Sequence, residues 1–174
     1  CLSLLGIARE VGAITGAATS LPVVPEVPAS IADTRAIVLD APEACPLYCG
    51  RIVKDVDAKA PTPEWMKRRL ERSGIRAISA LVDVTNYVML ELGQPLHAFD
   101  NTRLEGAVHA RMARAEEKLL LLNEQTIAVD ADILMISDDA KPLAMAGIMG
   151  GEESGITLET TELFLESAFF APKA

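Results

Sequence analysis

Polar groups interrupt an otherwise apolar pattern at three places in this 174-residue sequence, and each could do chemistry. The first is ELGQPLHAFD (91–100), where His97 follows an apolar segment that carries Thr85 and Asn86. An imidazole titrates near neutral pH and can orient a reactant or carry a proton. A single imidazole beside apolar side chains is also a common structural feature, so both roles stay open for His97. Asp83 and Asn86 share one helical face and can likewise satisfy each other in a buried network.

The second place is AMAGIMGGEESG (144–155), which holds Gly147, Gly150, Gly151 and Gly155. No Lys follows the last glycine, and the spacing is not that of a dinucleotide-binding loop, so a nucleotide-phosphate site is not indicated. Glycines allow close backbone approach, either to a small ligand or between two strands. Both interpretations fit the pattern.

The third place is Glu166 in LFLESAFF (163–170). In a strand, Glu166 shares a face with Phe164 and Ala168. Burying a carboxylate among such apolar side chains costs free energy unless a hydrogen-bond or ionic partner is present. The residue is therefore either an acid that binds a ligand or takes part in catalysis, or a glutamate that faces water on an edge strand.

The net charge of −9 argues against a broad nucleic-acid-binding face, which needs clustered Lys and Arg. The basic run 67–72 is therefore interpreted as a solvated helix face. No apolar run is long enough to span a bilayer, and no signal peptide is visible, so we expect no membrane partner. Because the sequence begins at Cys1 rather than Met, we expect it to be a piece of a longer polypeptide.

The cysteines and histidines give no metal or disulfide pattern. Cys45 and Cys49 would lie roughly 13 Å apart in a strand, beyond the reach of a disulfide. Two histidines distant from each other offer no metal-ligand spacing. The sequence therefore predicts no metal site and suits a reducing compartment.

Helical spacing of apolar residues predicts a helix over 2–15, ended by Gly16. Prolines then recur every third residue in LPVVPEVPAS (21–30), which is typical of an extended polyproline connector. We therefore predict two parts, an N-terminal helix with its Pro-rich connector over 1–33 and a domain over 34–174.

Within the second part, two strands (RAIVLD and PLYCGRIVKDV) are followed by two helices. PTPEWMKRRLERSG predicts a helix with Thr62 as its cap and Pro63 at its first position. The helix over 79–92 is apolar on most sides, so we expect it to be central. Six short strands are predicted after it: AVHARMA, KLLLL, TIAV, ILMIS, PLAMA and ELFLESAFF. This order predicts an α+β fold of packed, sandwich-like β-sheets flanked by helices, with the N-terminal helix on its connector.

The ordered motifs PTPEWMKRRLERSGIR, LVDVTNYVMLELGQPLHAFD, ARMA, PLAMAGIMGGEESGI and FLESAFF closely resemble the central region of the bacterial phenylalanyl-tRNA synthetase β subunit. The resemblance covers essentially the whole chain and is densest over 50–170. It implies an editing domain that hydrolyses tyrosine wrongly attached to the phenylalanine tRNA. Two further residues of the family's pocket, a Thr and an Ala, belong to a later segment that this sequence lacks.

Motif by motif, the resemblance places the editing pocket on residues from all three irregular places. Carried over in this way, His97, Thr85 and Asn86 would position the ester and the attacking water. The substrate-binding residues would be Glu166, Gly150, Gly151 and Arg76.

The resemblance also implies the setting of this activity. The partners would be the α subunit, which carries the aminoacylation site, and the tRNA 3′ end bearing tyrosine. This segment would need no cofactor, whereas the whole cytoplasmic enzyme would use ATP and Mg. The alternative is a non-catalytic scaffold or amino-acid-binding module of the same subunit. A measurement of hydrolysis would distinguish the editing site from this alternative, whereas ligand binding alone would not.

Overall fold

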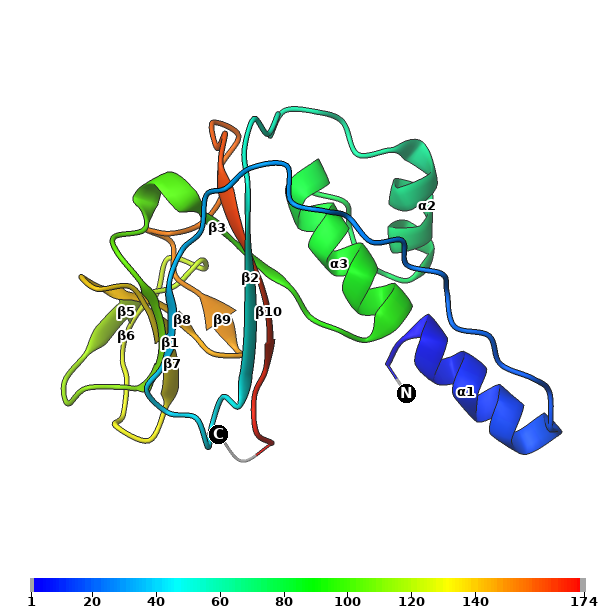
Figure 1. The fold of residues 1–174 in the computed structure, drawn as a ribbon, viewed down its shortest axis with the longest axis horizontal. Helices are drawn as coiled ribbons and strands as arrows, with labels where there is room; N and C mark the ends of the chain where they lie inside the picture. The colour runs from blue at the N-terminus through cyan, green and yellow to red at the C-terminus, as the bar shows by residue number, and fades with distance from the viewer. Residues whose placement is uncertain (1, 173–174) are drawn as a thin grey trace. The chain divides into compact units, whose positions relative to one another are not determined.

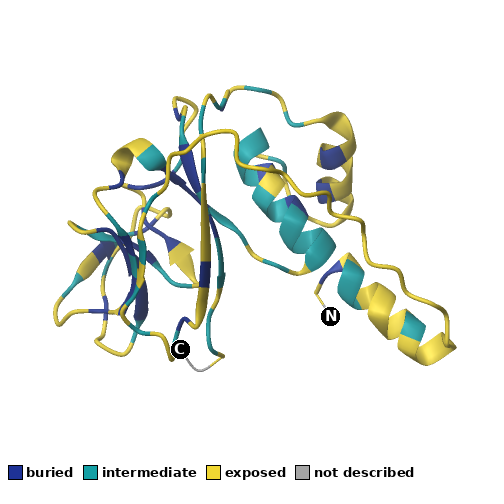
Figure 2. Cartoon of the chain, in the orientation of Figure 1, coloured by how far each residue is buried: buried dark blue, intermediate teal, exposed yellow. Residues whose placement is uncertain are grey.

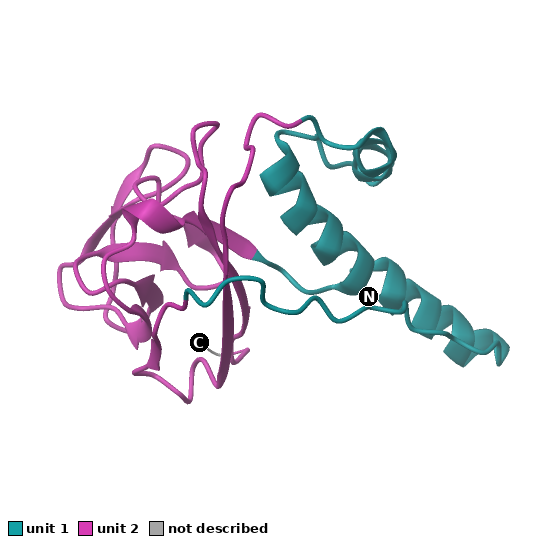
Figure 3. Cartoon of the chain, turned by 45° about the horizontal axis from the view of Figure 1, so that its top comes forward, with its two compact units in different colours: residues 1–33, 61–96 teal, residues 34–60, 97–174 magenta. Residues whose placement is uncertain are grey.

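The computed structural model describes residues 2–172 and divides the chain into two compact units. One unit consists of residues 1–33 and 61–96, and the other of residues 34–60 and 97–174 (Figure 3). The division at 33/34 coincides with the predicted start of the second domain, but residues 61–96 group with the N-terminal segment.

The first unit begins with helix α1 (Leu4–Thr15). The Ser3 hydroxyl accepts a hydrogen bond from the backbone N–H of Gly6, and Gly16 ends the helix in the left-handed region at φ 74°. Residues 16–36 contain no helix or strand, as the prolines predict. The predicted helix and extended connector are confirmed.

Helix α2 (Glu64–Arg72) has Pro63 at its N-cap and no side-chain cap. The prediction that Thr62 caps this helix is wrong, because its hydroxyl donates to the Oδ2 atom of Asp83 at 2.5 Å. A buried carboxylate needs donors more than an exposed helix end does, since water can satisfy the latter. The apolar face of α2 buries Met66 and Leu70 against Tyr87.

Helix α3 (Ala80–Leu92) ends at Gly93, whose φ is 80°. Its buried residues are Asp83 and Tyr87, and the rest of the helix is half-buried or exposed (Figure 2). The expected central position is therefore wrong. Asp83 also accepts a hydrogen bond from the backbone N–H of Ile78 at 2.9 Å, so its hydrogen bonds are with Thr62 and Ile78 rather than with Asn86, the partner that the structural alternative offered.

The second unit is a β-sandwich (Figure 1). One sheet has five strands, with β1 parallel to β4 and the other pairs antiparallel. In order across the sheet they are β1 (Ile37–Leu39), β4 (Val108–Met112), β7 (Leu134–Ser137), β8 (Pro142–Met145) and β9 (Met149–Gly150). The other sheet is antiparallel, in the order β2 (Leu47–Val53), β10 (Leu163–Phe169) and β3 (His97–Asp100).

The two sheets share one hydrophobic core (Figure 2). Phe99 and Phe164 from the three-stranded sheet are fully buried, with Val108, Ile136 and Leu143 from the other sheet in the same cluster. A separate hairpin, β5 (Lys118–Leu120) with β6 (Thr126–Ala128), has its own small cluster around Met135. The predicted α+β class with packed sheets is confirmed.

All eight predicted strands are present, and residues 2–172 contain two further strands and a turn of 3₁₀-helix that were not predicted. The missed elements are β3, the 3₁₀ turn η1 (Asn101–Arg103) and β9. Both missed strands are short and adjoin Pro or Gly, which weaken the local signal for a strand. The missed strand β3 matters most, because it carries His97.

A histidine clamp links separate segments of the sandwich. The Nδ1 atom of His109 lies 2.9 Å from Asp40 Oδ2, and its Nε2 atom lies 2.7 Å from Asp139 Oδ1. Hydrogen bonds to Asp139 and Asp40 raise the pKa of His109, and the bond to His109 lowers the pKa of Asp139. The clamp is therefore strongest when the imidazole is protonated and both carboxyl groups are ionised.

We expect His109→Ala to destabilise the chain in a pH-dependent way. Because the folded-state pKa of His109 is raised, its contribution is present below pH 6.5 and is lost as pH rises through the folded pKa. Because the folded-state pKa of Asp139 is lowered, its contribution is present above pH 3.8 and is lost as pH falls through the folded pKa. Thermal unfolding at pH 5.5 should show a midpoint about 2 °C lower in the variant, with the gap closing by pH 9. A gap independent of pH would show that the clamp acts by packing alone.

Candidate functional site

Strand pairing brings His97 and Glu166 together inside the sandwich. Strands β3 and β10 are antiparallel, with Glu166 opposite His97 and Phe164 opposite Phe99. Opposite residues in an antiparallel pair project to the same face, with Cβ atoms roughly 5 Å apart. Since Phe99 and Phe164 lie in the core between the sheets, His97 and Glu166 face the same interior. The pairing of β3 with β10 thus joins two residues that lie 69 positions apart in the sequence.

Glu166 is a buried carboxyl group, 8% exposed, on the central strand of its sheet. The alternative of an edge-strand glutamate facing water is therefore wrong. The Tyr48 hydroxyl donates a hydrogen bond to Glu166 Oε2. Burial raises the pKa of Glu166 to about 7, although the hydrogen bond from Tyr48 acts in the opposite direction. The group can therefore accept a hydrogen bond as a carboxylate, or donate one as an acid, near neutral pH.

The imidazole of His97 packs with its plane at 73° to the Phe99 ring, the two centroids 4.4 Å apart. Its Nε2 atom is buried and has no hydrogen-bond partner among residues 2–172. Burial lowers the pKa of His97, so the ring is neutral at physiological pH. A buried polar atom without a partner costs free energy, which a bound polar group or water would recover.

The glycine segment (residues 147–155) lies against His97 and Phe99. An added Cβ at Gly150 would stand 2.7 Å from Cε1 and 3.0 Å from Nε2 of His97. An added Cβ at Gly151 would stand 2.6 Å from the backbone oxygen of Leu143, to which the Gly151 N–H donates at 2.7 Å. Gly155 forms a bridge with Phe99. The glycines therefore permit close approach between strands, and Gly150 provides the space that the His97 ring occupies.

We expect Gly150→Ala to destabilise the fold by about 1–3 kcal/mol, because the new methyl group meets the His97 ring. Adding His97→Ala should remove most of this penalty, with a coupling energy of about 1 kcal/mol or more in denaturant unfolding. Gly151→Ala is the matched control, since its contact is with backbone and His97→Ala cannot relieve it. Additive effects of Gly150→Ala and His97→Ala would contradict this packing.

The other predicted site residues lie in the first unit. Arg76 is exposed in the segment between α2 and α3. Thr85 and Asn86 are half-buried on α3, and the Thr85 hydroxyl donates to the Val82 backbone oxygen at 2.8 Å. The second unit thus contains His97, Gly150, Gly151 and Glu166 of the seven predicted residues.

Sequence reasoning missed Tyr48, the partner of Glu166. Tyr48 lies on β2, 8% exposed, and its hydroxyl reaches Glu166 across 118 residues of sequence. A signal was present in the sequence. Tyr48 shares an apolar strand face with Ile52, and a buried tyrosine needs a hydrogen-bond partner for its hydroxyl. The sequence did not indicate which partner.

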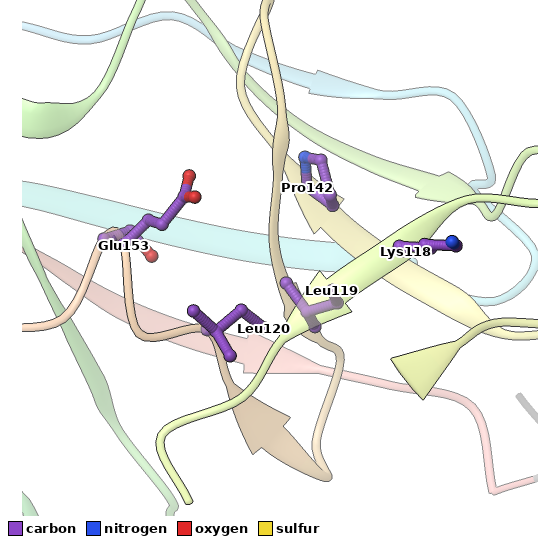
Figure 4. A pocket seen from close by; sticks show the side chains of 7 residues that line it. Lys118, Leu119, Leu120, Pro142 and Glu153 are labelled. Carbon is purple, nitrogen blue, oxygen red and sulfur yellow. The ribbon is translucent and has the colours of Figure 1, made fainter. Parts of the chain in front are cut away.

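A pocket of about 230 Å³ lies beside the glycine segment (Figure 4). It includes Gly151, but His97 and Glu166 are not among its lining residues. Its walls are formed by Lys118, Leu119, Leu120, Pro142, Gly151, Glu153 and Ser154.

Residues 2–172 contain neither a metal-ligand cluster nor a membrane-spanning helix. Within that range, no three His, Cys, Asp or Glu residues are placed to hold a metal ion. Cys45 is buried and Cys49 exposed, both as free thiols. No helix in the described part of the chain has the length and apolar character needed to cross a membrane.

Comparisons with known proteins point to one family. Residues 44–174 match the model of the B3/4 domain. The whole chain is 91% identical to part of the phenylalanine–tRNA ligase β subunit of Dechloromonas aromatica (strain RCB) and 67% identical to part of that of Aromatoleum aromaticum. In both cases the chain spans 22% of the relative's length.

A solved structure supports the fold. An N-terminal fragment of the phenylalanyl-tRNA synthetase β subunit from Pyrococcus horikoshii superposes with a TM-score of 0.58 at 15% identity. The match covers 98% of this chain and 52% of that fragment. At this identity the likeness concerns the fold alone.

Proposed function

Because the chain belongs to the B3/4 domain family and aligns with one segment of phenylalanine–tRNA ligase β subunits, we propose that it forms an editing site for mischarged tRNA. The substrate is tyrosine esterified to the 3′ end of the phenylalanine tRNA. Water adds its hydroxyl to the tyrosyl carbonyl carbon, the bond to the ribose oxygen breaks, and that oxygen takes the proton. The products are free tyrosine and uncharged tRNA.

The observation that carries this proposal is the buried carboxyl group of Glu166 beside His97. Tyrosine and phenylalanine differ by one hydroxyl group. An apolar pocket discriminates poorly on that basis, whereas a polar group left unpaired by the wrong ligand rejects it by up to ~10⁴-fold. Glu166 would accept the phenol hydrogen bond of tyrosine, and phenylalanine would leave it less satisfied.

His97 is suited to the hydrolytic step. Its ring is neutral, and its unpartnered Nε2 atom can accept a hydrogen bond from water or donate one to the ester, according to the tautomer. An orienting group of this kind contributes rate by holding water and ester in a reactive geometry. The terminal hydroxyl of the tRNA would supply part of the proton transfer.

The remaining roles rest on the family resemblance. Thr85 and Asn86 would help to position the ester, and Arg76, Gly150 and Gly151 would be substrate-binding residues. In the whole cytoplasmic enzyme, the α subunit would carry out aminoacylation with ATP and Mg. The net charge of −9 means that tRNA binding would depend largely on other parts of that enzyme.

The test is hydrolysis of Tyr-tRNA(Phe) by the complete β subunit assembled with its α subunit. We expect rapid hydrolysis, with Phe-tRNA(Phe) largely spared. The 174-residue chain alone should hydrolyse the ester poorly, because its acidic surface offers little grip on RNA. Tyrosine binding without hydrolysis by the complete enzyme would instead support the amino-acid-binding module, and neither binding nor hydrolysis would support the scaffold.

A further inference from the structure

The hydrogen bond between Tyr48 and Glu166 joins two buried ionisable groups within the sandwich. Directly opposite Glu166 on β2 lies Gly50, which has no side chain to offer. An added Cβ at Gly50 would stand 2.2 Å from Cζ of Phe164, so the phenylalanine ring fills that space. The donor to Glu166 comes instead from the diagonal position, Tyr48, which is within reach of an aromatic side chain.

We propose that Tyr48 is a positioning residue for Glu166, holding carboxylate oxygen Oε2 so that Oε1 is presented to the phenol of a bound tyrosyl group. This inference rests on the editing function proposed above. The carboxylate of Glu166 would then accept hydrogen bonds from two phenols, that of Tyr48 and that of the substrate's tyrosyl group.

The geometry gives Tyr48 a fixed direction of donation. Burial, and then the charge of Glu166, raise the pKa of Tyr48 well above its ordinary value, so its hydroxyl keeps its proton. A permanent donor on Oε2 restrains the terminal torsion of the glutamate and selects which oxygen faces a ligand. It also favours the carboxylate form, which accepts the substrate's phenol hydrogen.

Stability alone does not require this pair. Replacing buried ionisable partners by apolar side chains of similar volume is often neutral or stabilising. The surrounding core is apolar and could accommodate such a replacement. A binding role gives a reason for the pair that packing does not.

The titratable side chains that face Glu166 are Tyr48 from β2, Cys45 from the turn before β2, and His97 from β3. Cys45 is a buried thiol with a raised pKa, and His97 has a lowered pKa. Both are neutral at pH 7. A change in the pH dependence of tyrosine selection on altering Tyr48 therefore reports on Glu166.

The experiment measures kcat/KM for hydrolysis of Tyr-tRNA(Phe) and Phe-tRNA(Phe) by the complete α–β enzyme between pH 6 and 8.5. Tyr48→Phe keeps the ring and removes the hydroxyl. We expect it to lower the preference for tyrosine roughly tenfold at pH 7. We also expect the pH midpoint of that preference to move upward, with recovery towards pH 8.5 as Glu166 ionises.

Tyr87→Phe is the matched control, because Tyr87 is the other tyrosine of the chain and its hydroxyl bonds Glu91 in the first unit. It should leave both the preference and its midpoint unchanged. If Tyr48→Phe does not fold, 3-fluorotyrosine at position 48 decides the matter. As a stronger donor, it should move the midpoint downward.

Two outcomes would overturn the inference while leaving the editing function intact. A faster rate for Tyr48→Phe would mean that Tyr48 competes with the substrate for Glu166. An unchanged preference and midpoint, in Tyr48→Phe or in the fluorotyrosine variant, would make the pair structural. Absence of tyrosine hydrolysis by the wild-type enzyme would overturn the proposed function and this inference together.

Discussion

Glu166→Ala should erase the preference for tyrosine over phenylalanine. The variant removes the buried acceptor, so the substrate's phenol gains nothing over a phenyl ring. A buried polar group left unpaired costs about 1–3 kcal/mol, which predicts a roughly 10- to 100-fold fall in the preference. Hydrolysis of Tyr-tRNA(Phe) and Phe-tRNA(Phe) by the complete enzyme measures it. A preference that survives in a folded Glu166→Ala enzyme would remove Glu166 from the recognition of tyrosine.

Glu166→Gln tests the free-energy cost of burying an ionisable side chain at this position. Because burial raises the folded-state pKa of Glu166 to about 7 from an ordinary 4.5, the wild type loses stability as pH rises between these values. The loss is on the order of 3 kcal/mol, since each unit of pKa corresponds to about 1.4 kcal/mol. The glutamine variant has no such titration, so the difference in unfolding free energy between pH 4 and pH 8 should shrink. An unchanged difference would show that Glu166 is not the group that titrates.

His97→Ala should slow hydrolysis of Tyr-tRNA(Phe) by about 10- to 100-fold, the lower range for a positioned acid–base or orienting group. The reason is the loss of the neutral imidazole, whose Nε2 atom has no hydrogen-bond partner in the described part of the chain. Stability should change little. The variant loses the ring's contact with Phe99 but also removes a buried atom that lacks a hydrogen bond, so we expect a change within about 1 kcal/mol.

His109→Ala is the matched control for this experiment, since His109 is the only other histidine in the sequence. Its two aspartate partners belong to the clamp, so its removal should alter the pH dependence of unfolding and leave hydrolysis unaffected. A large loss of stability in His97→Ala with normal hydrolysis would make His97 a structural residue. The opposite pattern would support its role in the site.

Local periodicity was sufficient to determine most elements of this protein. Alternation in 163–169 placed Glu166 on the face of Phe164, because side chains of a strand alternate regardless of what the strand pairs with. Gly16 and Gly93 marked the ends of α1 and α3, since each adopts a left-handed conformation that glycine tolerates without a steric penalty. These features depend on residues close together in the chain.

Motif resemblance supplied the candidate residues, but the sequence did not supply their partners. Thr62 is a residue type that commonly caps helices, yet its hydroxyl donates a hydrogen bond to Asp83, 21 residues away. The short strand β3 has little signal of its own and exists because β10 pairs with it. Register with that strand, rather than any local pattern, sets His97 opposite Glu166.

Only the tertiary structure showed that Glu166 already holds a phenol, that of Tyr48, and that the His97 ring fills the space above Gly150. Both contacts join segments far apart in sequence, and their formation depends on the packing of two whole sheets. The alternation of a strand is fixed by backbone geometry within a few residues, so a sequence displays it directly. Which distant side chain a residue contacts depends on which surfaces are buried together. Those surfaces are buried cooperatively when the whole core packs.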